Sequence, residues 1–539
     1  MKYFDAIVIG AGFSGIYMTY QLRENGFTVQ GFEKAAGVGG VWYYSRYPGA
    51  KCDSESIYYN FTFSKELFEK WSWSARYARQ SEILRYLNFV ADELDIKQYF
   101  KFNTEVIAAK RLEERNLWLV ETADGTTYTC QYLISAVGCL STSHIPNIPG
   151  RDQFKGESYH TGHWPHEPVD LKGKRIGVIG TGSSGVQTIP EVAKYAKHVY
   201  VFQRTPQYTA PAHDREFTEE DIKKYKAGFD EMRIKMRKSA SGLPFNKPNK
   251  SALSDSQEER QATYEKAWQT GGMAMTHTYN DLVVNEKSNE TISQFVRDKI
   301  SQIVEDPNVA RKLLPNYYFG TKRPIVNTNY YESYNLPNVS LVSLREEPIQ
   351  EITETGIQTT AAHYPLDMII FATGYDAITG TLLRLNIQGT DGKLIREQWD
   401  NGKSTETYLG LAMNNFPNFF TITGPQSPSV LTNMPIAIEQ HVEWIMDLLN
   451  YMRNHQLDLV EATKVAQQQW TAKCLAIAEK TLYLKTDSWY TGANIDGKPK
   501  GFLIYLGGLD TYRAICDEVA ENNYQGFMLT RTNVPNRVN

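Results

Sequence analysis

Residues 6–15, AIVIGAGFSG, decide the fold of this 539-residue chain. An apolar run that reads as a buried strand leads directly into Gly10, Gly12 and Gly15, and the residues that follow read as a helix. In such a strand–turn–helix unit the glycines let the backbone approach a pyrophosphate, which rests on the positive N-terminus of the helix. The stretch therefore predicts a dinucleotide site, although one copy is weak evidence because small residues are common in such turns.

A second copy of this pattern occupies residues 176–185, IGVIGTGSSG, with glycines at Gly180, Gly182 and Gly185. Each copy lies between a strand pattern and a helix pattern, so two accidental small-residue turns are a poor explanation. Two such units predict two bound dinucleotides, each on its own Rossmann-like domain.

The residue that ends the next strand differs in charge between the two copies. After the first copy, the strand at residues 28–32 ends in Glu33, and a carboxylate near this offset accepts hydrogen bonds from a ribose with a free 2′-hydroxyl. This suits the adenosine of FAD or NAD. After the second copy, the strand at residues 198–202 leads to Arg204 and Thr205, and an arginine there favours a 2′-phosphate. This suits NADP.

The amino-acid composition limits which binding partners and which cellular compartment the protein is expected to have. The 57 basic and 61 acidic residues nearly balance, which indicates neither a nucleic-acid surface nor a patch for anionic membranes. Five scattered cysteines without a CxxC pair argue against a disulfide framework, a zinc site and a redox dithiol. No apolar run approaches the roughly 20 residues that span a bilayer, and no signal-peptide pattern precedes the first strand. We therefore expect small-molecule partners, no metal, a cytoplasmic location and a monomer or weak homo-oligomer.

The two halves of the chain share a longer plan. Apolar strands at residues 133–138 and 368–374 each end in a small residue and a glycine, the pattern with which flavoproteins of two dinucleotides close their nucleotide-binding units. The second half is about 66 residues longer between equivalent glycines, so it contains an insertion. Capping-box patterns at residues 218–221, TEED, and 256–259, SQEE, predict that this insertion is mostly helical.

The expected fold is therefore α/β, with two Rossmann-like dinucleotide-binding domains, one for FAD and one for NADP, and a mostly helical insertion. The chain is expected to return to the first domain after completing the second. The expected order is an FAD-binding domain, first part, at 1–145; an NADP-binding domain, first part, at 146–214; the helical insertion at 215–320; the second part of the NADP-binding domain at 321–380; and the second part of the FAD-binding domain at 381–539.

Residues 154–165, FKGESYHTGHWP, have the spacing FxGxxxHxxxWP. This stretch resembles the fingerprint of single-chain, FAD- and NADPH-dependent Baeyer–Villiger monooxygenases, the family that includes cyclohexanone and phenylacetone monooxygenases. Residues 40–53, GVWYYSRYPGAKCD, and 367–376, DMIIFATGYD, resemble two further patterns of that family, and the resemblance extends over essentially the whole chain. One departure is His166, where many members have Asp. The implied reaction converts a ketone to an ester or lactone with NADPH and dioxygen through a C4a-peroxyflavin.

The resemblance implies catalytic roles for two residues. Arg323 matches the active-site arginine of the family, and Asp53 matches the carboxylate that lies beside the flavin and holds that arginine in place. A guanidinium keeps its proton and can aim two donors at an oxygen on which negative charge develops. Without the resemblance, Arg323 would read as a solvated arginine and Asp53 as a helix cap.

The resemblance also implies residues that bind the cofactors. Lys322 is expected near the 2′-phosphate of NADP beside Arg204, Trp489 near the nicotinamide-side nucleotide, and Trp42 beside the flavin. Without the resemblance, the lysine would read as a surface residue and Trp489 as a core residue. His160 is expected to couple domain movement to cofactor position rather than to transfer protons.

Residues 424–434, GPQSPSVLTNM, resemble the substrate loop of the family and are expected to line a ketone pocket that admits bulky or aromatic ketones. Three other functions are alternatives. A heteroatom-oxidising flavin monooxygenase is disfavoured by Arg323 and by Trp164 and Pro165. A pyridine-nucleotide disulfide reductase is excluded because no CxxC or CxxxxC pair is present beside the flavin. A non-catalytic nucleotide-binding sensor would be excluded by ketone-dependent consumption of NADPH.

Overall fold

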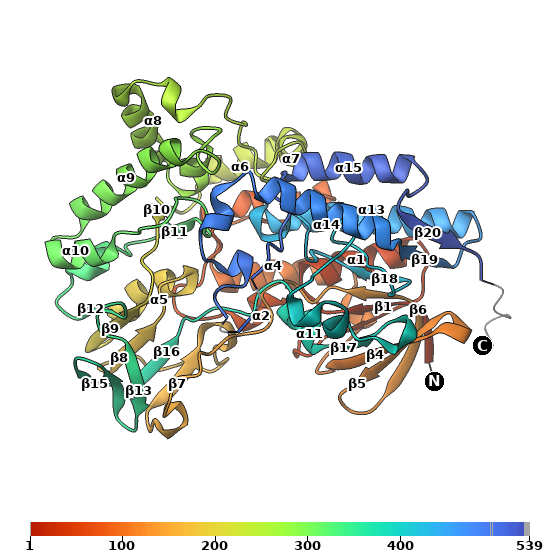
Figure 1. Ribbon diagram of the computed structural model, residues 1–539, viewed down its shortest axis with the longest axis horizontal. Coiled ribbons are helices and arrows are strands. Elements are labelled where there is room, and N and C mark those ends of the chain that lie inside the picture. The colour runs from red at the N-terminus through yellow and green to blue at the C-terminus, as the bar shows by residue number, and fades with distance from the viewer. Residues whose placement is uncertain (1, 496, 499, 533–539) are drawn as a thin grey trace.

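The computed structural model describes residues 2–495, 497–498 and 500–532. In this part of the chain two α/β units lie side by side, each built on its own sheet of mainly parallel strands (Figure 1). The larger sheet lies on the right of that view and the smaller one on the left. The predicted fold class, two Rossmann-like domains in an α/β protein, is confirmed.

The first unit is built on an eight-stranded sheet in the order β17–β4–β5–β6–β1–β2–β3, with β18 paired to β6. The strands around β1 are parallel, whereas β5 is antiparallel to both β4 and β6. The strands are β1 Lys2–Ile9, β2 Val29–Phe32, β3 Phe100–Lys101, β4 Val106–Leu112, β5 Leu117–Thr122, β6 Thr127–Ser135, β17 Asn386–Gln388 and β18 Phe419–Thr421. Because β17 and β18 join this sheet, the chain returns to the first unit after leaving the second.

The second unit is built on a five-stranded, wholly parallel sheet in the order β12–β9–β8–β16–β7. Helices or loops cover both faces of a parallel sheet, and β16, Met368–Phe371, is accordingly apolar and buried at every position. The other strands are β7 Glu157–His160, β8 Arg175–Ile179, β9 His198–Gln203 and β12 Val339–Ser343. A small antiparallel sheet lies between β12 and β16 in the chain, formed by β13 Ile349–Thr353, β14 Gly356–Thr359 and β15 His363–Pro365.

The insertion leaves and re-enters the second unit through a two-stranded parallel ribbon. β10, Thr209–Pro211, precedes the insertion and pairs with β11, Ile325–Asn327, which follows it. The inserted helices are α6 Glu219–Ala227, α7 Phe229–Arg237, α8 Gln257–Thr270, α9 Glu286–Ile303 and α10 Pro307–Leu313. Both predicted capping boxes are present, at the starts of α6 and α8. The ribbon fixes where the chain re-emerges, two residues after Arg323.

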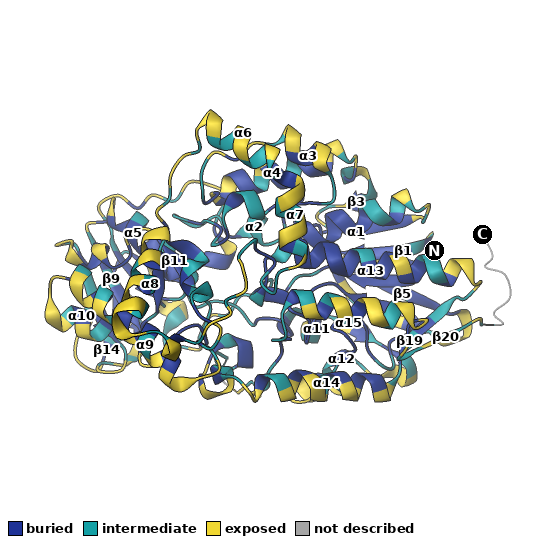
Figure 2. Cartoon of the chain, turned by 90° about the horizontal axis from the view of Figure 1, so that it is seen from above, coloured by how far each residue is buried: buried dark blue, intermediate teal, exposed yellow. Residues whose placement is uncertain are grey.

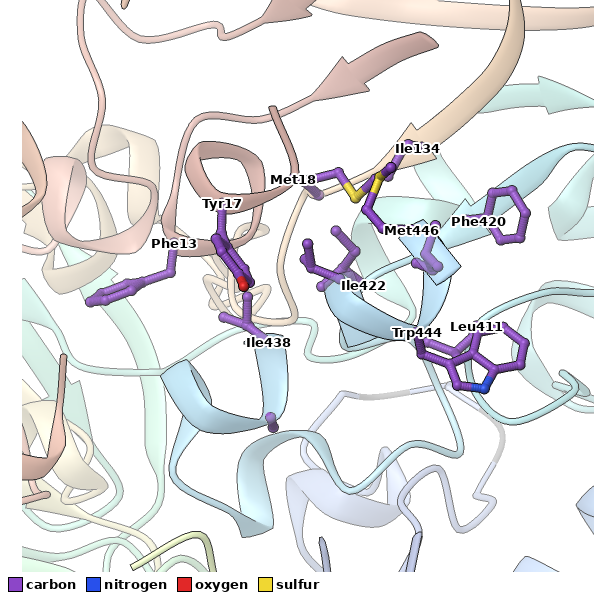
Figure 3. Close-up of a cluster of buried hydrophobic side chains, with 14 of the residues drawn as sticks. Phe13, Tyr17, Met18, Ile134, Leu411, Phe420, Ile422, Ile438, Trp444 and Met446 are labelled. Carbon is purple, nitrogen blue, oxygen red and sulfur yellow. The ribbon is translucent and has the colours of Figure 1, made fainter. Parts of the chain in front are cut away.

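Helices of the C-terminal part cover one face of the larger sheet. The long helix α13, Met434–Asn454, packs along α1, Phe13–Glu24, and Figure 3 shows Tyr17 of α1 beside Ile438 of α13, and Met18 of α1 beside Met446 of α13, in this core. Figure 2 shows the same layering, with buried strands inside and exposed outer helix faces. The remaining described helices of this unit are α2 Val41–Tyr44, α3 Lys65–Lys70, α4 Gln80–Glu93, α11 Gly380–Arg384, α12 Ile395–Gln398, α14 Lys464–Ala478 and α15 Leu509–Glu521, and a ribbon joins β19 Leu459–Ala462 to β20 Phe527–Thr530.

Two chain segments connect the units and are hydrogen-bonded to each other. Ser143 and Tyr375 form an antiparallel bridge, His144 N donates to Gly374 O at 2.9 Å, and Asp376 N donates to Thr142 O at 2.9 Å. The crossings therefore meet as one short ribbon, which places the carboxyl ends of both parallel sheets around a shared space. In the described ranges, no helix has the length and apolarity needed to cross a bilayer.

Candidate active site

A cavity of about 1490 Å³ opens between the two units, at the carboxyl ends of their parallel strands. Of the catalytic and cofactor-binding residues predicted from sequence, only Gly15 and Gly185 are outside its lining, because they lie under the first turns of α1 and α5, Ser183–Ala193. The predicted residues that line it are Gly10, Gly12, Glu33, Trp42, Asp53, Gly180, Gly182, Arg204, Thr205, Lys322, Arg323 and Trp489. Segments far apart in sequence thus meet around one space.

The two glycine-rich turns have nearly identical geometry. Gly10 and Gly180 have φ angles of 104° and 105°, which side chains rarely adopt. A Cβ atom on Gly15 would lie 1.8 Å from the Gly10 carbonyl oxygen, and one on Gly185 would lie 2.2 Å from that of Gly180. Glycine is therefore required for the tight turn and for the close approach of helix to strand, as in dinucleotide-binding units.

Glu33 is a buried carboxylate at the end of β2. Its Oε2 accepts a hydrogen bond from Ala11 N at 2.8 Å and its Oε1 accepts one from Ala35 N at 2.8 Å. These bonds fix the carboxylate against the first glycine-rich turn and leave acceptor capacity on both oxygens. The arrangement fits an adenosine ribose with free hydroxyls, as in FAD.

Three cations gather at the second glycine-rich turn, where Arg204, Lys322 and Arg345 all line the large cavity. Lys322 Nζ donates to Asp487 O at 2.6 Å and lies 4.9 Å from the centre of the Tyr317 ring. Burial, and then the charge of Arg204, lower the pKa of Lys322 to about 8. Within the described ranges none of the three cations forms an ion pair with a carboxylate. This excess of positive charge, which the charge of Asp487 offsets only in part, fits the 2′-phosphate of NADP.

Arg323 and Asp53 form a two-point ion pair at the centre of the site. Arg323 Nε donates to Asp53 Oδ2 at 2.8 Å and Nη2 donates to Oδ1 at 2.7 Å, while Nη1 donates to the carbonyl oxygen of Val430. Burial lowers the pKa of Arg323, but the charge and hydrogen bonds of Asp53 more than reverse this and leave the pKa raised. The guanidinium is therefore permanently charged and fixed in orientation.

A second, smaller cavity of about 200 Å³ lies on another side of Arg323. The helical insertion, the turn Leu431–Asn433 and the side chains of Tyr483 and Tyr490 form its walls. Of residues 424–434, these three turn residues line the small cavity, while Val430 and Met434 line the large one. Among the described residues, Arg323 is the side chain that lines both cavities. It therefore separates a space of cofactor size from one of small-ligand size.

His160 lies outside the linings of both cavities, at the end of β7. Its Nδ1 accepts a hydrogen bond from Gly162 N at 2.9 Å, and burial, with the charge of His163 as a lesser cause, lowers its pKa to about 4. Its ring stands against Tyr375 of the second crossing at 6.2 Å. Four residues later, the backbone N–H of the buried Trp164 donates to Tyr44 O at 3.2 Å. This fingerprint segment thus contacts both units, and its His160 remains uncharged near neutral pH.

Sequence reasoning missed several residues that the fold brings to the site. Arg345 joins the cation cluster, Tyr317 lies under Lys322, and Tyr490 lines the small cavity. Two of them had a sequence signal. Arg345 follows β12, a parallel strand whose carboxyl end meets the others, and Tyr490 directly follows Trp489. For Tyr317, which lies in a loop of the insertion, the sequence carries no comparable signal.

Comparison with known proteins adds independent findings. The family model "FMO-like: Flavin-binding monooxygenase-like" matches residues 5–212. Phenazine N-monooxygenase PhzNO1 of Lysobacter antibioticus is 44% identical over 98% of this chain and 97% of that protein, and cyclohexanone 1,2-monooxygenase of Acinetobacter sp is 43% identical over 97% of this chain and 96% of that protein. The solved complex of OTEMO with FAD and NADP superposes with a TM-score of 0.95 at 39% identity, over 98% of this chain and 99% of that chain.

Proposed function

The chain belongs to the flavin-binding monooxygenases, and from this premise we propose that it is an FAD- and NADPH-dependent Baeyer–Villiger monooxygenase that converts ketones to esters or lactones. One oxygen atom of dioxygen enters the bond beside the carbonyl, the other leaves as water, and NADPH supplies two electrons. The observation that carries the proposal is the position of Arg323, a fixed guanidinium between a cofactor-sized cavity and a small one.

The cofactors have residues that fit them. The first glycine-rich turn and Glu33 would hold the pyrophosphate and ribose of FAD, with Trp42 on the flavin side. The second turn with Arg204, Thr205 and Lys322 would hold NADP, and Trp489 would contact its nicotinamide-side nucleotide. When bound, FAD and NADPH supply the electrons and the flavin chemistry that activate dioxygen.

Arg323 would act on the ketone directly. Oxygenation of a ketone places negative charge on the carbonyl oxygen. In a site that excludes water, a cationic donor that is already in position stabilises this charge, because the donor does not have to move during the reaction. Asp53 would be a positioning residue, because its two hydrogen bonds fix the guanidinium plane. The backbone carbonyl of Val430 fixes the third side of the same group.

The small cavity is the proposed ketone chamber. Its volume of about 200 Å³ lies below the roughly 300 Å³ at which pockets for drug-sized ligands begin. This favours compact ketones in the conformation described. The expectation that bulky or aromatic ketones are accepted remains a prediction, and it would require movement of the turn at 431–433 or of the insertion.

A second candidate is oxygenation of an aromatic ring nitrogen. It is favoured by one observation, the 44% identity to phenazine N-monooxygenase PhzNO1. Ring-nitrogen oxygenation places no negative charge on a substrate carbonyl, so the bidentate Arg323–Asp53 pair gives the ketone reaction the stronger support. Product analysis after incubation with cyclohexanone or with phenazine, each with NADPH, separates the two.

The remaining expectations also stay proposals. Sheet membership supports domain boundaries near 145, 214, 320 and 380, because the strands of each unit fall within these ranges. The near balance of 57 basic and 61 acidic residues supports small-molecule partners rather than nucleic acid. A cytoplasmic location and a monomeric or weakly oligomeric state are proposed on composition alone.

Replacement of Arg323 by Ala tests the proposed function. NADPH should still bleach the flavin absorbance, whereas ester formation should fall by about a hundredfold to a thousandfold, with NADPH oxidation diverted to hydrogen peroxide. Asp53→Ala should lower ester formation less. Stopped-flow reduction and product chromatography measure the two effects.

The chain offers a matched control. Arg175 and Asp367 form an ion pair of the same bidentate kind, at 3.1 and 2.7 Å, outside the linings of both cavities. Arg175→Ala should therefore leave the ester yield per NADPH unchanged. A normal ester yield from Arg323→Ala would remove this residue from the mechanism and favour the ring-nitrogen reaction.

A further inference from the structure

Tyr490 lines the small cavity and has a hydroxyl hydrogen without an acceptor. The residue is 0% exposed, its oxygen lies on the side of the Arg323 guanidinium, and among the described residues no group accepts its hydrogen. Leaving a buried hydroxyl unpaired is unfavourable, since it has lost its bonds to water without replacing them. Where such a group lines a cavity, a ligand that occupies the cavity can supply the missing partner.

The tyrosine ring is held firmly, so its hydroxyl has a defined position. Tyr490 lies in a single 3₁₀ turn, Trp489–Thr491, which is closed by a hydrogen bond from Thr491 N to Ser488 O at 3.1 Å. Its ring is in contact with Trp489 at 4.4 Å between centroids and with Tyr483 at 5.9 Å. Only rotation of the hydroxyl hydrogen is left free.

The guanidinium of Arg323 controls the protonation and direction of this hydroxyl. Burial raises the pKa of Tyr490 and the positive charge of Arg323 lowers it, with burial the larger effect, so the hydroxyl keeps its proton. A cation attracts the hydroxyl oxygen and repels its hydrogen. The hydrogen is therefore directed away from Arg323 and is available to an acceptor in the cavity.

Arg323 itself has donors to spare on the same side. A guanidinium has five N–H groups, and three of them are engaged by Asp53 and by Val430 O. The Tyr490 oxygen also lies close to this guanidinium, and the remaining N–H groups have no other acceptor among the described residues. A carbonyl oxygen in the small cavity can thus meet both the guanidinium and the phenol.

Other polar groups of the cavity wall are less suited to this role. The His277 ring nitrogens are engaged, Nδ1 with Met273 O at 3.0 Å and Nε2 with Ser241 Oγ at 3.3 Å. Tyr483 also lines the cavity but is only partly buried, so water can satisfy its hydroxyl.

We propose that the Tyr490 hydroxyl donates a hydrogen bond to the carbonyl oxygen of the ketone, as a second donor beside Arg323. The proposal rests on the proposed function, because it takes the small cavity as the ketone chamber. Tyr490 would then be a catalytic residue, since its hydrogen bond strengthens as negative charge grows on the carbonyl oxygen.

Tyr490→Phe tests this directly, because it removes one oxygen atom and keeps the ring. With cyclohexanone as substrate, kcat for ester formation should fall by on the order of a hundredfold, while the rate of flavin reduction by NADPH stays unchanged. The infrared carbonyl stretch of carbon-13-labelled cyclohexanone bound to the oxidised enzyme should move to higher frequency, because it has lost a donor. The melting temperature should change little, since the hydroxyl hydrogen has no acceptor in the described part of the protein.

Tyr505→Phe is the matched control, because Tyr505 is equally buried, stacks on Trp470 at 5.2 Å and lies outside both cavity linings. It should change neither kcat nor the carbonyl stretch. An unshifted carbonyl band with parental kcat in Tyr490→Phe would overturn the proposal. A lowered melting temperature together with an unshifted band would assign the hydroxyl a structural role and overturn it as well. Failure of the parent enzyme to form any ester would instead contradict the proposed function, so the two failures are distinguishable.

Discussion

Charge at single residues separates the two nucleotide sites. Glu33 presents a buried carboxylate whose oxygens are held by two backbone N–H groups, and the equivalent end of the second unit carries Arg204. Arg204, Lys322 and Arg345 repel one another, and in the described ranges no carboxylate is ion-paired with any of them. A 2′-phosphate bound at this cluster, as proposed above, would reduce the repulsion.

The lowered pKa of Lys322 predicts how NADPH recognition depends on pH. In the protein without nucleotide, Lys322 loses its proton as the pH rises through about 8. A bound 2′-phosphate favours the charged form, so above that pH NADPH binding must take up a proton. The KM for NADPH should therefore be flat below pH 8 and rise above it, by up to about tenfold per pH unit.

Steady-state kinetics between pH 6.5 and 9.5 measure this dependence. NADH, which lacks the phosphate, should show a flatter profile over the same range. Lys322→Arg keeps its charge throughout and should restore a flat profile for NADPH. Parallel NADPH profiles for the parent and Lys322→Arg would show that another group is responsible.

At the scale of elements, the ribbon of β10 and β11 and the helix α7 position the walls of the small cavity, the proposed ketone chamber. The ribbon sets Arg323 at the exit of the insertion. At the other end, α7 stops at Arg237, whose guanidinium donates twice to Glu443 of α13, with the Nη1 bond at 3.1 Å. Ser241 and Leu243, which line the small cavity, follow directly. The cavity wall thus depends on an ion pair between the insertion and the first unit.

Arg237→Ala should loosen this wall. Both partners are about three-quarters covered, with side-chain exposures of 24% and 28%, so we expect the free energy of unfolding to fall by about 1–3 kcal/mol. The KM for the ketone should rise, while the KM for NADPH should not change. Denaturant titration and steady-state kinetics measure the two effects.

An exposed ion pair on the same helix provides the control. Lys65 of α3 and Asp230 of α7 are 52% and 70% exposed, so Lys65→Ala should leave the free energy of unfolding almost unchanged. If Arg237→Ala weakened the fold but left the ketone KM unchanged, α7 would support the fold without shaping the chamber.

At the scale of the whole molecule, the same α/β dinucleotide-binding arrangement occurs twice, and the two units are structurally separate. Each unit has its own sheet, its own glycine-rich turn and its own strand-end charge. The units meet at the paired crossings and around the large cavity. Damage confined to one nucleotide site should therefore leave the other intact.

Gly182→Ala tests this separation. Gly182 has a φ of −72°, and a Cβ added there would have no atom within 4 Å, so the substitution fits the protein without strain. The methyl group would instead project into the large cavity, where the NADP pyrophosphate is proposed to bind. The KM for NADPH should rise by about 10–200-fold, with unchanged FAD content and melting temperature.

Gly228→Ala serves as the comparison, because its added Cβ would meet only ordinary contacts at 3.5 Å and it lies outside both cavity linings. FAD content is read from the visible absorbance and NADPH affinity from initial rates. Loss of FAD from Gly182→Ala would mean that the two sites are not independent.

The sequence predicted those structural features that are determined by residues close together in the chain. The glycine turns, the charges at Glu33 and Arg204 and the capping boxes at 218–221 and 256–259 each lie within about 25 residues of the pattern that predicts them. The family resemblance extended this to Arg323, whose pairing with a residue 270 positions away the structure shows directly.

The remaining features depend on contacts between distant segments. The small cavity is lined by the insertion, the turn at 431–433 and Tyr490. No sequence pattern within any of these segments predicts that they lie next to one another. The antiparallel strands β13 to β15 and the pairing of the two crossings likewise follow from the packing of the completed units. An unpaired hydroxyl such as that of Tyr490 is visible only once all its neighbours are placed.

One guanidinium belongs to the walls of both cavities, and this has a thermodynamic consequence. Any nucleotide that alters the position or the electrostatic surroundings of Arg323 also alters the free energy of a ketone on its other side. Such a dependence is necessarily reciprocal, so the ketone must change the affinity for the nucleotide by the same factor. The substrate is then also an effector of its own co-substrate, and the coupling between their affinities passes through this shared side chain.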